Sequence, residues 1–199
     1  MGEDTVARKK DVQGDRERLS AAVWAVLAER GLPGLTLRAV AERAGCTTGL
    51  VLHTFPDKRA LLVHARETLH RRTAVRADAA EHGAPDAVGK LEAVLSQAVT
   101  PTDNHDESRV WVGFLAASLA DPVLADVHVA HSRAFLRRLE RLLAPVRPDW
   151  DDARRGQAAK SLVALVEGFN VLAVRDPDTY AQDVKDTAIK AAVARLGLS

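Results

Sequence analysis

The sequence has little cysteine, few aromatic residues and no long apolar run. Its 199 residues include a single cysteine, Cys46, and only 4% are aromatic. A lone cysteine excludes an internal disulfide, so the fold does not depend on an oxidising compartment. Scarce aromatic residues, together with abundant Ala, Leu and Arg, favour helices over sheets.

Signals for secretion and membrane insertion are also missing. The first 20 residues, "MGEDTVARKKDVQGDRERLS", are charged and lack the apolar core of a signal peptide. No apolar run approaches the roughly 18 residues that a membrane-spanning helix needs. We therefore expect a cytoplasmic protein with no membrane partner.

Patterns typical of enzymes are absent as well. There is no phosphate-binding glycine loop, no dinucleotide fingerprint and no HExxH pair. Cys46 and His53 could in principle serve as nucleophile and base, but Cys46 is explained more simply as a small turn residue. His128 and His131 could share a metal, yet their spacing fixes no third ligand. We expect no enzymatic activity, no catalytic residues, no cofactor and no bound metal.

The charge is distributed unevenly along the chain. Residues 1–76 contain 14 Lys and Arg against 9 Asp and Glu, whereas residues 77–199 contain 14 against 18. A basic first part joined to a mildly acidic remainder indicates an anionic partner for the first part. The alternative is chance variation among solvated faces.

Apolar residues recur at helical spacing along nearly the whole chain, and no segment alternates with period two. The pattern predicts a helix that ends at Gly31, a second that opens at Thr36 and stops at Gly45, and a very short third before Pro56. A long fourth helix follows, and further helices are expected at about 86–100, 105–120, 122–146, 150–175 and 178–197. We therefore predict an all-α protein of about nine helices, divided into residues 1–60 and 61–199.

The very short third helix is the most informative element. A helix, a turn containing glycine and a second short helix form a helix-turn-helix unit, whose second helix enters the major groove of DNA. Val51 and Phe55 lie four residues apart and are expected to face inward. Thr48, Leu52 and His53 are left facing outward, where they can meet a groove.

Residues 36–62, "TLRAVAERAGCTTGLVLHTFPDKRALL", resemble the DNA-binding segment of the TetR family of bacterial repressors. The matching positions are a Thr that opens a helix, an Ala-Gly turn, a small polar residue before x-Gly, and a Phe followed by Lys. In this sequence they are Thr36, Ala44, Gly45, Thr47, Gly49, Phe55 and Lys58. The resemblance implies a sequence-specific regulator whose partner is double-stranded operator DNA.

The resemblance also implies roles for individual residues. Hydroxyl and lysine side chains would hold phosphates, an arginine would reach a base edge or a phosphate, and the short helix would line the groove. The phosphate ligands would be Thr36, Thr47 and Lys58, the arginine Arg38, and the groove residues Thr48, Leu50, Leu52 and His53.

Two positions depart from the family pattern. Leu52 stands where the family usually has Tyr, and Thr54 stands where it has an aromatic residue. Leu52 cannot donate a hydrogen bond to phosphate but can contact a thymine methyl group. A flexible basic arm, Arg8 to Lys10, could supply phosphate contacts that Leu52 cannot make. The alternative is that this segment is only a solubilising tail.

Residues 61–199 would form a ligand-binding and dimerisation body. In the family, the last two helices dimerise and the middle helices bind a small molecule. Residues 161–174, "SLVALVEGFNVLAV", are apolar nearly all round, which fits either a central core helix or a helix facing a twin subunit. The layout of residues 86–199, with "WVGFLAASLADPVLADVH" and "LVEGFNVLAVRDPD", resembles the betaine-regulator-like subgroup.

Candidate ligand-binding residues are the aromatic and polar side chains of the body helices. The alternative for each is ordinary core packing, because aromatics at helical spacing are usually buried in a core. The candidates are Trp111, Phe114, His131, Phe135, Phe169 and Asn170.

Together these patterns predict a homodimeric helix-turn-helix regulator, expected to be a repressor that responds to an unidentified small-molecule effector. The alternative is a helical ligand-binding or protein-interaction module that has lost DNA binding. Leu52 in place of Tyr is the feature that keeps this alternative open.

Overall fold

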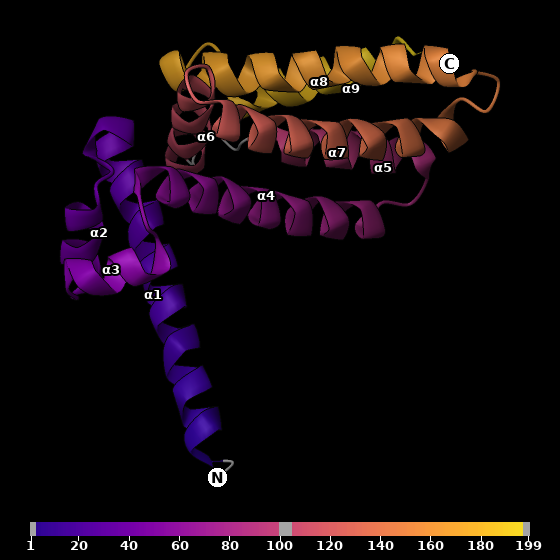
Figure 1. The fold of residues 1–199 in the computed structure, drawn as a ribbon. Helices are drawn as coiled ribbons and strands as arrows, with labels where there is room; N and C mark the ends of the chain where they lie inside the picture. The colour runs from indigo at the N-terminus through magenta and orange to yellow at the C-terminus, as the bar shows by residue number, and fades with distance from the viewer. Residues whose placement is uncertain (1–2, 100–104, 197–199) are drawn as a thin grey trace.

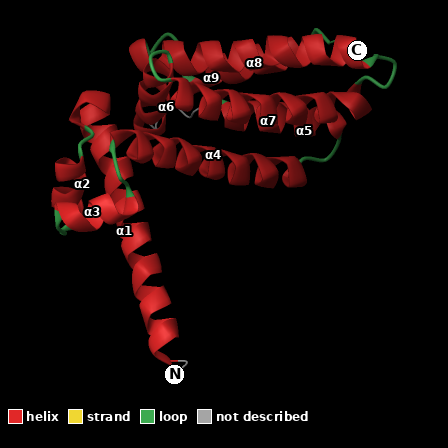
Figure 2. Cartoon of the chain, viewed as in Figure 1, coloured by secondary structure: helices red, strands yellow, loops and turns green. Residues whose placement is uncertain are grey.

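The computed structural model describes the backbone of residues 3–99 and 105–196, and the side chains of 14–99 and 107–196. These parts contain nine helices and no strand, which confirms the all-α prediction (Figures 1 and 2). The helices are α1 (Glu3–Gly34), α2 (Leu37–Ala44), α3 (Thr48–Thr54), α4 (Lys58–Gly83), α5 (Ala87–Ala98), α6 (His105–Ser118), α7 (Pro122–Val146), α8 (Asp152–Arg175) and α9 (Gln182–Ala194).

Side chains that precede the helices fix where most of them begin. The oxygen of such a side chain accepts a hydrogen bond from a backbone N–H of the first turn, a group that has no partner within the helix. Thr36 and Thr47 do this for α2 and α3, accepting from the N–H groups of Ala39 at 3.0 Å and Leu50 at 3.3 Å. The carboxylates that cap α4, α5, α7 and α8 belong to Asp57, Asp86, Asp121 and Asp151.

Two glycines adopt left-handed backbone geometry where the head turns. Gly45, at φ 63° and ψ 38°, ends α2 and starts the turn into α3. Gly31, at φ 63°, breaks α1 at the residue where the sequence predicted the helix to end. One further turn containing Pro33 extends the element to Gly34, which the sequence pattern did not predict.

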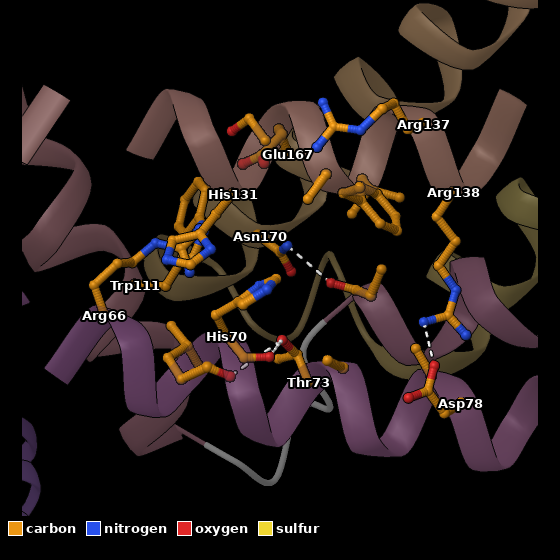
Figure 3. A pocket seen from close by; sticks show the side chains of 18 of the residues that line it. Arg66, His70, Thr73, Asp78, Trp111, His131, Arg137, Arg138, Glu167 and Asn170 are labelled. Carbon is orange, nitrogen blue, oxygen red and sulfur yellow. Dashed lines mark hydrogen bonds and ion pairs between the residues drawn. The ribbon is translucent and has the colours of Figure 1, made fainter. Parts of the chain in front are cut away.

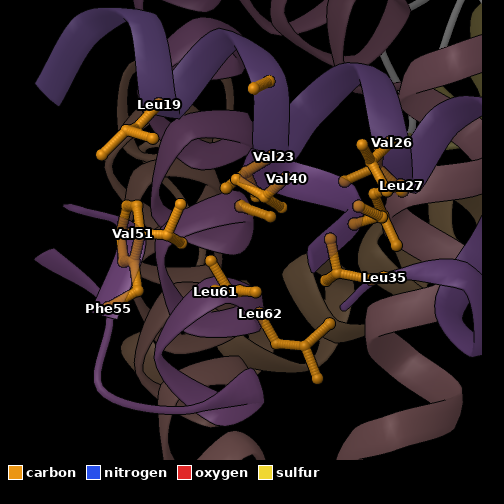
Figure 4. Packing of buried hydrophobic residues seen from close by; sticks show 14 of the residues in the cluster. Leu19, Val23, Val26, Leu27, Leu35, Val40, Val51, Phe55, Leu61 and Leu62 are labelled. Atoms are coloured by element: carbon orange, nitrogen blue, oxygen red, sulfur yellow. The ribbon is translucent and has the colours of Figure 1, made fainter. Parts of the chain in front are cut away.

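The buried apolar side chains form two clusters. The first joins α1, α2, α3 and the start of α4 to Val110 and Phe114 of α6 and to Leu124 of α7; Figure 4 shows its central part. The second joins α5, α7, α8 and α9 to Ala77, near the far end of α4. Helix α4 therefore takes part in both clusters and runs from the three-helix head along the body (Figure 1).

Helix α8 is incompletely covered by its own chain. By length and composition alone it is the one helix in the described part that could cross a membrane, yet only 22% of its most apolar stretch is buried. Val171 and Leu172 leave 38% and 44% of their surface exposed. An apolar helix with an open face also fits contact with a second protein chain.

The turn at Gly45 gives the first prediction. We expect Gly45→Ala to lower the free energy of unfolding by about 1–2 kcal/mol, because a β-carbon is strained at φ 63° although no atom crowds it. Gly83→Ala is the control, since Gly83 ends α4 with no positive φ and a β-carbon there also meets nothing. Urea unfolding of both variants provides the measurement; equal effects would contradict the prediction.

Candidate DNA interface and effector cavity

The short helix α3 presents one polar face and buries the other. Val51 and Phe55 are buried in the first cluster, as predicted, with 0% and 5% of their surface exposed. Thr48 and His53 are exposed, and Leu52 leaves 45% of its surface exposed. The three side chains predicted from the sequence to face outward are therefore exposed.

The threonines expected to hold phosphates also cap helices. Thr36 and Thr47 are exposed, and each hydroxyl oxygen accepts a backbone N–H. A hydroxyl both accepts and donates, so each retains its own hydrogen for a phosphate oxygen. Leu50, also expected to line the groove, is half-buried.

The two cations expected at DNA are exposed and unpaired within the described part of the chain. No ion pair joins Arg38 or Lys58 to an acidic side chain there. By contrast, Arg43 on the same helix as Arg38 pairs with Glu29 of α1 at 2.6 Å. Arg38 and Lys58 thus keep their charge available for an external anion. The side chains of the other predicted cations, Arg8 to Lys10, lie outside the described residues.

A second site lies in the body, where a cavity of about 520 Å³ opens between α4, α6, α7 and α8 (Figure 3). That volume is in the range typical of small-molecule sites. Most of its surface is apolar, although eleven of the nineteen residues that line it are polar or charged. The lining includes Arg66, Leu69, His70, Thr73, Ala74, Ala77, Asp78, Ala98, Trp111, His131, Ser132, Ala134, Phe135, Arg137, Arg138, Arg141, Val166, Glu167 and Asn170.

Four of the six predicted ligand-binding residues line this cavity: Trp111, His131, Phe135 and Asn170. Phe114 does not line it, because its side chain lies in the first cluster with 1% exposed. Phe169 packs against the second cluster, with its ring 6.3 Å from that of Tyr180. Asn170 donates a hydrogen bond to the backbone oxygen of Ala98 at 3.1 Å, which holds its amide in place.

Arg66 is the most unusual side chain in the cavity. It is 7% exposed, and no hydrogen bond or ion pair reaches its guanidinium from the described residues. The ring of Phe114 lies 5.9 Å from it. Burial lowers the pKa of Arg66 to about 10, although the nearby Glu167 carboxylate favours the charged form.

The other ionisable groups around Arg66 are pushed towards their neutral forms. Burial raises the pKa of Glu167 to about 6, and the charge of Arg66 only partly offsets this. Burial, followed by the charge of Arg66, lowers the pKa of His131 to about 4. The rings of His70 and His131 lie 3.9 Å apart, and burial lowers the pKa of His70 too.

The two histidines that the sequence raised as a pair, His128 and His131, make different contacts. His131 faces His70 of α4, and the Nε2 atom of His128 lies 3.5 Å from the hydroxyl of Ser132. Within the described residues, no group of three or more His, Cys, Asp or Glu side chains could hold a metal ion.

An ion-pair network includes three of the lining residues, Asp78, Arg138 and Arg141. Arg138 of α7 pairs with Asp78 and Glu81 of α4 at 2.6 and 2.7 Å, and Arg141 pairs with Glu81 at 2.8 Å. These interactions, with Arg141 the larger cause, lower the pKa of Glu81 to about 2. The charges of Arg138 and Arg141 are therefore already neutralised by acidic partners.

The sequence interpretation missed Arg66, His70 and Glu167. Glu167 is the only acid in the otherwise apolar stretch 161–174, so the criterion that selected Asn170 would also have selected it. Arg66 stands four residues after Leu62 and three before Leu69, which places a charge on the buried stripe of α4. Such a charge on an apolar stripe is a signal for a buried functional group.

A helix-turn-helix head with unpaired cations, joined by one helix to a ligand-sized cavity, defines a DNA-binding transcriptional regulator. Comparison with family models agrees: residues 19–65 match the bacterial regulatory proteins of the tetR family. Residues 87–198 match the C-terminal region of BetI-type transcriptional repressors. The chain belongs to the TetR family of transcriptional regulators and carries a BetI-type body.

Individual relatives support this assignment. The HTH-type transcriptional regulator BetI of Burkholderia mallei is 34% identical over 159 residues, which cover 77% of this chain and 78% of the relative. A crystal structure of a transcriptional regulator from Rhodococcus superposes with a TM-score of 0.80 at 27% identity, covering 90% of this chain and 94% of that one. A regulator from Saccharomonospora viridis, solved in complex with choline, shares the fold at TM-score 0.81 and 19% identity, covering 92% and 96%.

The half-buried carboxyl group of Glu167 gives the second prediction. We expect Glu167→Gln to raise the free energy of unfolding by up to about 2 kcal/mol at pH 8, because ionising Glu167 in the folded state is unfavourable. A raised pKa means that the wild type loses this stability as pH rises from 4.5, its ordinary pKa, through about 6. The difference between the two proteins should therefore vanish below pH 4.5.

Denaturant unfolding at pH 4, 6 and 8 measures this difference. Glu92→Gln is the matched control, since it makes the same change at a half-buried glutamate of α5 that does not line the cavity. A difference for Glu167→Gln that stays constant across this pH range would contradict a raised pKa of the Glu167 carboxyl group.

Proposed function

We propose that this protein is a ligand-responsive repressor that binds a palindromic operator as a homodimer in the cytoplasm. The observation that carries the proposal is the position of α4. Its first residue, Lys58, lies at the expected DNA face, and Arg66, His70 and Thr73 on the same helix line the cavity. A ligand in the cavity therefore contacts the helix that leads to the head.

The packing around α4 supports this coupling. Leu69 is buried in the first cluster and also lines the cavity, so this side chain connects the packing beneath the head to the cavity wall. At the start of α4, the Nε–H of Arg59 donates to Asp121 at 2.6 Å, and the other oxygen of Asp121 caps α7. A shift of α7 on ligand binding would therefore be felt at the head end of α4.

The protein is expected to have two conformations, one that fits the operator and one that does not. To relieve repression, the effector must have the higher affinity for the conformation that does not fit the operator.

Selection of bound sequences from a random duplex pool tests the DNA-binding part of the proposal. Enrichment of a palindrome is expected, with half-sites about one helical turn apart and affinity that falls steeply with salt.

The third prediction concerns the cations at the DNA face. We expect the double variant Arg38→Ala/Lys58→Ala to weaken operator binding by at least 10-fold at about 0.15 M salt, because unpaired cations release counterions from phosphates. The slope of log K against log salt should become shallower by about 0.9 for each phosphate that the variant no longer neutralises. Fluorescence anisotropy across a salt series measures both quantities.

A matched control removes the same charge from the body. Lys90→Ala/Arg133→Ala deletes two cations from α5 and α7 and should leave the slope nearly unchanged. Equal effects of both double variants would mean that only net charge matters. An unchanged affinity in Arg38→Ala/Lys58→Ala would favour the second candidate, a module that no longer reads DNA and that exposes Leu52 in place of the usual Tyr.

A second copy of the chain is the proposed occupant of the open face of α8. Val171 and Leu172 of α8 and Val184 of α9 leave 38%, 44% and 44% of their surface exposed. These are the two helices through which the family resemblance implies dimerisation. A two-fold dimer would also match the symmetry of a palindromic operator.

The fourth prediction follows from this face. We expect Leu172→Glu to convert the dimer to a monomer at micromolar concentration, because pairing would bury an uncompensated charge. Leu119→Glu, at a residue that is 85% exposed in the turn after α6, should leave the dimer intact. Sedimentation velocity distinguishes the species, and a Leu172→Glu dimer as tight as the wild type would place the interface elsewhere.

A further inference from the structure

We infer that the effector of this protein is an anion, a monocarboxylate with an apolar body, whose carboxylate pairs with the buried guanidinium of Arg66. The inference rests on the proposed function, because it names the chemical class of ligand for the cavity between α4, α6, α7 and α8. It begins from the one buried cation in the lining that has no hydrogen-bond or ion-pair partner among the described residues.

The guanidinium of Arg66 is built to receive a planar anion. It is 93% buried, its Nε atom has no hydrogen-bond partner, and the side chain lines the cavity next to Trp111 and His131 (Figure 3). Buried charged groups are usually paired and hydrogen-bonded. A bound anion would supply the hydrogen bonds that this guanidinium lacks at the cavity wall. A guanidinium offers parallel N–H donors that match the two oxygens of a carboxylate.

The other arginines of the lining do not compete for this role. Arg138 and Arg141 are paired with Asp78 and Glu81, and Arg137 is exposed to solvent at the rim. The positive potential inside the cavity therefore centres on Arg66.

Glu167 is the one acidic side chain that acts on the charge of Arg66, and no hydrogen bond or ion pair joins the two within the described residues. Burial raises the pKa of Glu167 to about 6, so its carboxylate is ionised at pH 8 but is held less favourably than an exposed one. His70 and His131 are neutral at physiological pH because burial and the charge of Arg66 lower their pKa values. A cationic ligand would meet the repulsion of Arg66, whereas an anionic one would replace a weak, unbonded counter-charge.

The rest of the cavity fits an apolar body. Apolar side chains such as Leu69, Trp111, Phe135 and Val166 line part of the cavity beyond Arg66, and the amide of Asn170 is held by the Ala98 oxygen. Only two aromatic residues other than histidine line the cavity, Trp111 and Phe135. A quaternary ammonium is typically held by an aromatic cage, and this lining supplies two rings beside four arginines. The lining thus suits an aliphatic or aromatic carboxylate better than a quaternary ammonium.

The test compares two probes that share one body and differ in the charge of the head group. Octanoate and octyltrimethylammonium are titrated into the full-length protein by calorimetry at pH 8. We expect octanoate to bind and octyltrimethylammonium to bind at least 10-fold more weakly. Further monocarboxylates, from butyrate to decanoate with benzoate, cover the range of body sizes, and binding of none of them would overturn the inference.

Two cavity variants should shift the affinity for octanoate in opposite directions. Arg66→Met keeps the volume but removes the charge and the donors, and should weaken octanoate binding roughly 10- to 100-fold. Glu167→Gln removes the repelling negative charge and should tighten octanoate binding roughly 5-fold at pH 8. Arg71→Met, on the same helix but outside the lining, should have no effect.

The reverse pattern would overturn the inference. If octyltrimethylammonium binds, and binds more tightly to Arg66→Met and more weakly to Glu167→Gln, the cavity is a cation site. Glu167→Gln keeps the test valid even if Arg66→Met does not fold, because its predicted sign differs between the two ligand classes.

Operator binding separates this inference from the proposed function. Octanoate binding that depends on Arg66 but leaves operator affinity unchanged supports the carboxylate site and contradicts ligand control of DNA binding. Release of the operator by a cationic or neutral ligand, with no carboxylate bound, overturns the carboxylate site and keeps ligand control. Release by octanoate in the wild type but not in Arg66→Met supports both.

Discussion

Helix α4 is the element on which the rest of the molecule depends, because it is built into both hydrophobic clusters. Leu61, Leu62 and Ala65 secure its first turns among α1, α2 and α3, and Ala77 secures its far end among the body helices. A continuous α-helix is stiff, with a rise of about 1.5 Å per residue, so its two ends cannot move independently. The short helix α3 precedes it directly, so the DNA face inherits the orientation of α4.

Electrostatic contacts fix α4 at both ends, and between them Arg76 pairs with Glu107 of α6 at 2.6 Å and His64 hydrogen-bonds Ser20 of α1 at 2.8 Å. Arg59 binds Asp121 near the head, while Asp78 and Glu81 bind Arg138 of α7 at the other end. Exposed ion pairs contribute little to stability individually, yet pairs at the two ends of one helix restrict how it can tilt. Between them lies Arg66, where the cavity can respond to a ligand.

The sequence was sufficient for the helices because their signals are local. The capping Thr and Asp residues, the left-handed Gly45 and the apolar periodicity each act within a few residues, and the structure places the helices where these signals indicate. The cavity was only partly predictable, because it depends on which helices pack together. Nothing local distinguishes Arg66 from the exposed Arg71 and Arg72 one to two turns later; only the position of Arg66 on the apolar stripe does.

The groups that the sequence interpretation missed are also those that oppose folding. Burying Arg66 without a hydrogen bond, and Glu167 beside it with a raised pKa, is unfavourable compared with apolar residues of similar volume. Local conflicts of this kind are expected where a site serves a ligand and not the fold. Burial of the Arg66 charge reduces the stability of the free protein, and a complementary anion would neutralise that charge. Because Arg66 belongs to α4, part of the free energy of anion binding would act on this helix.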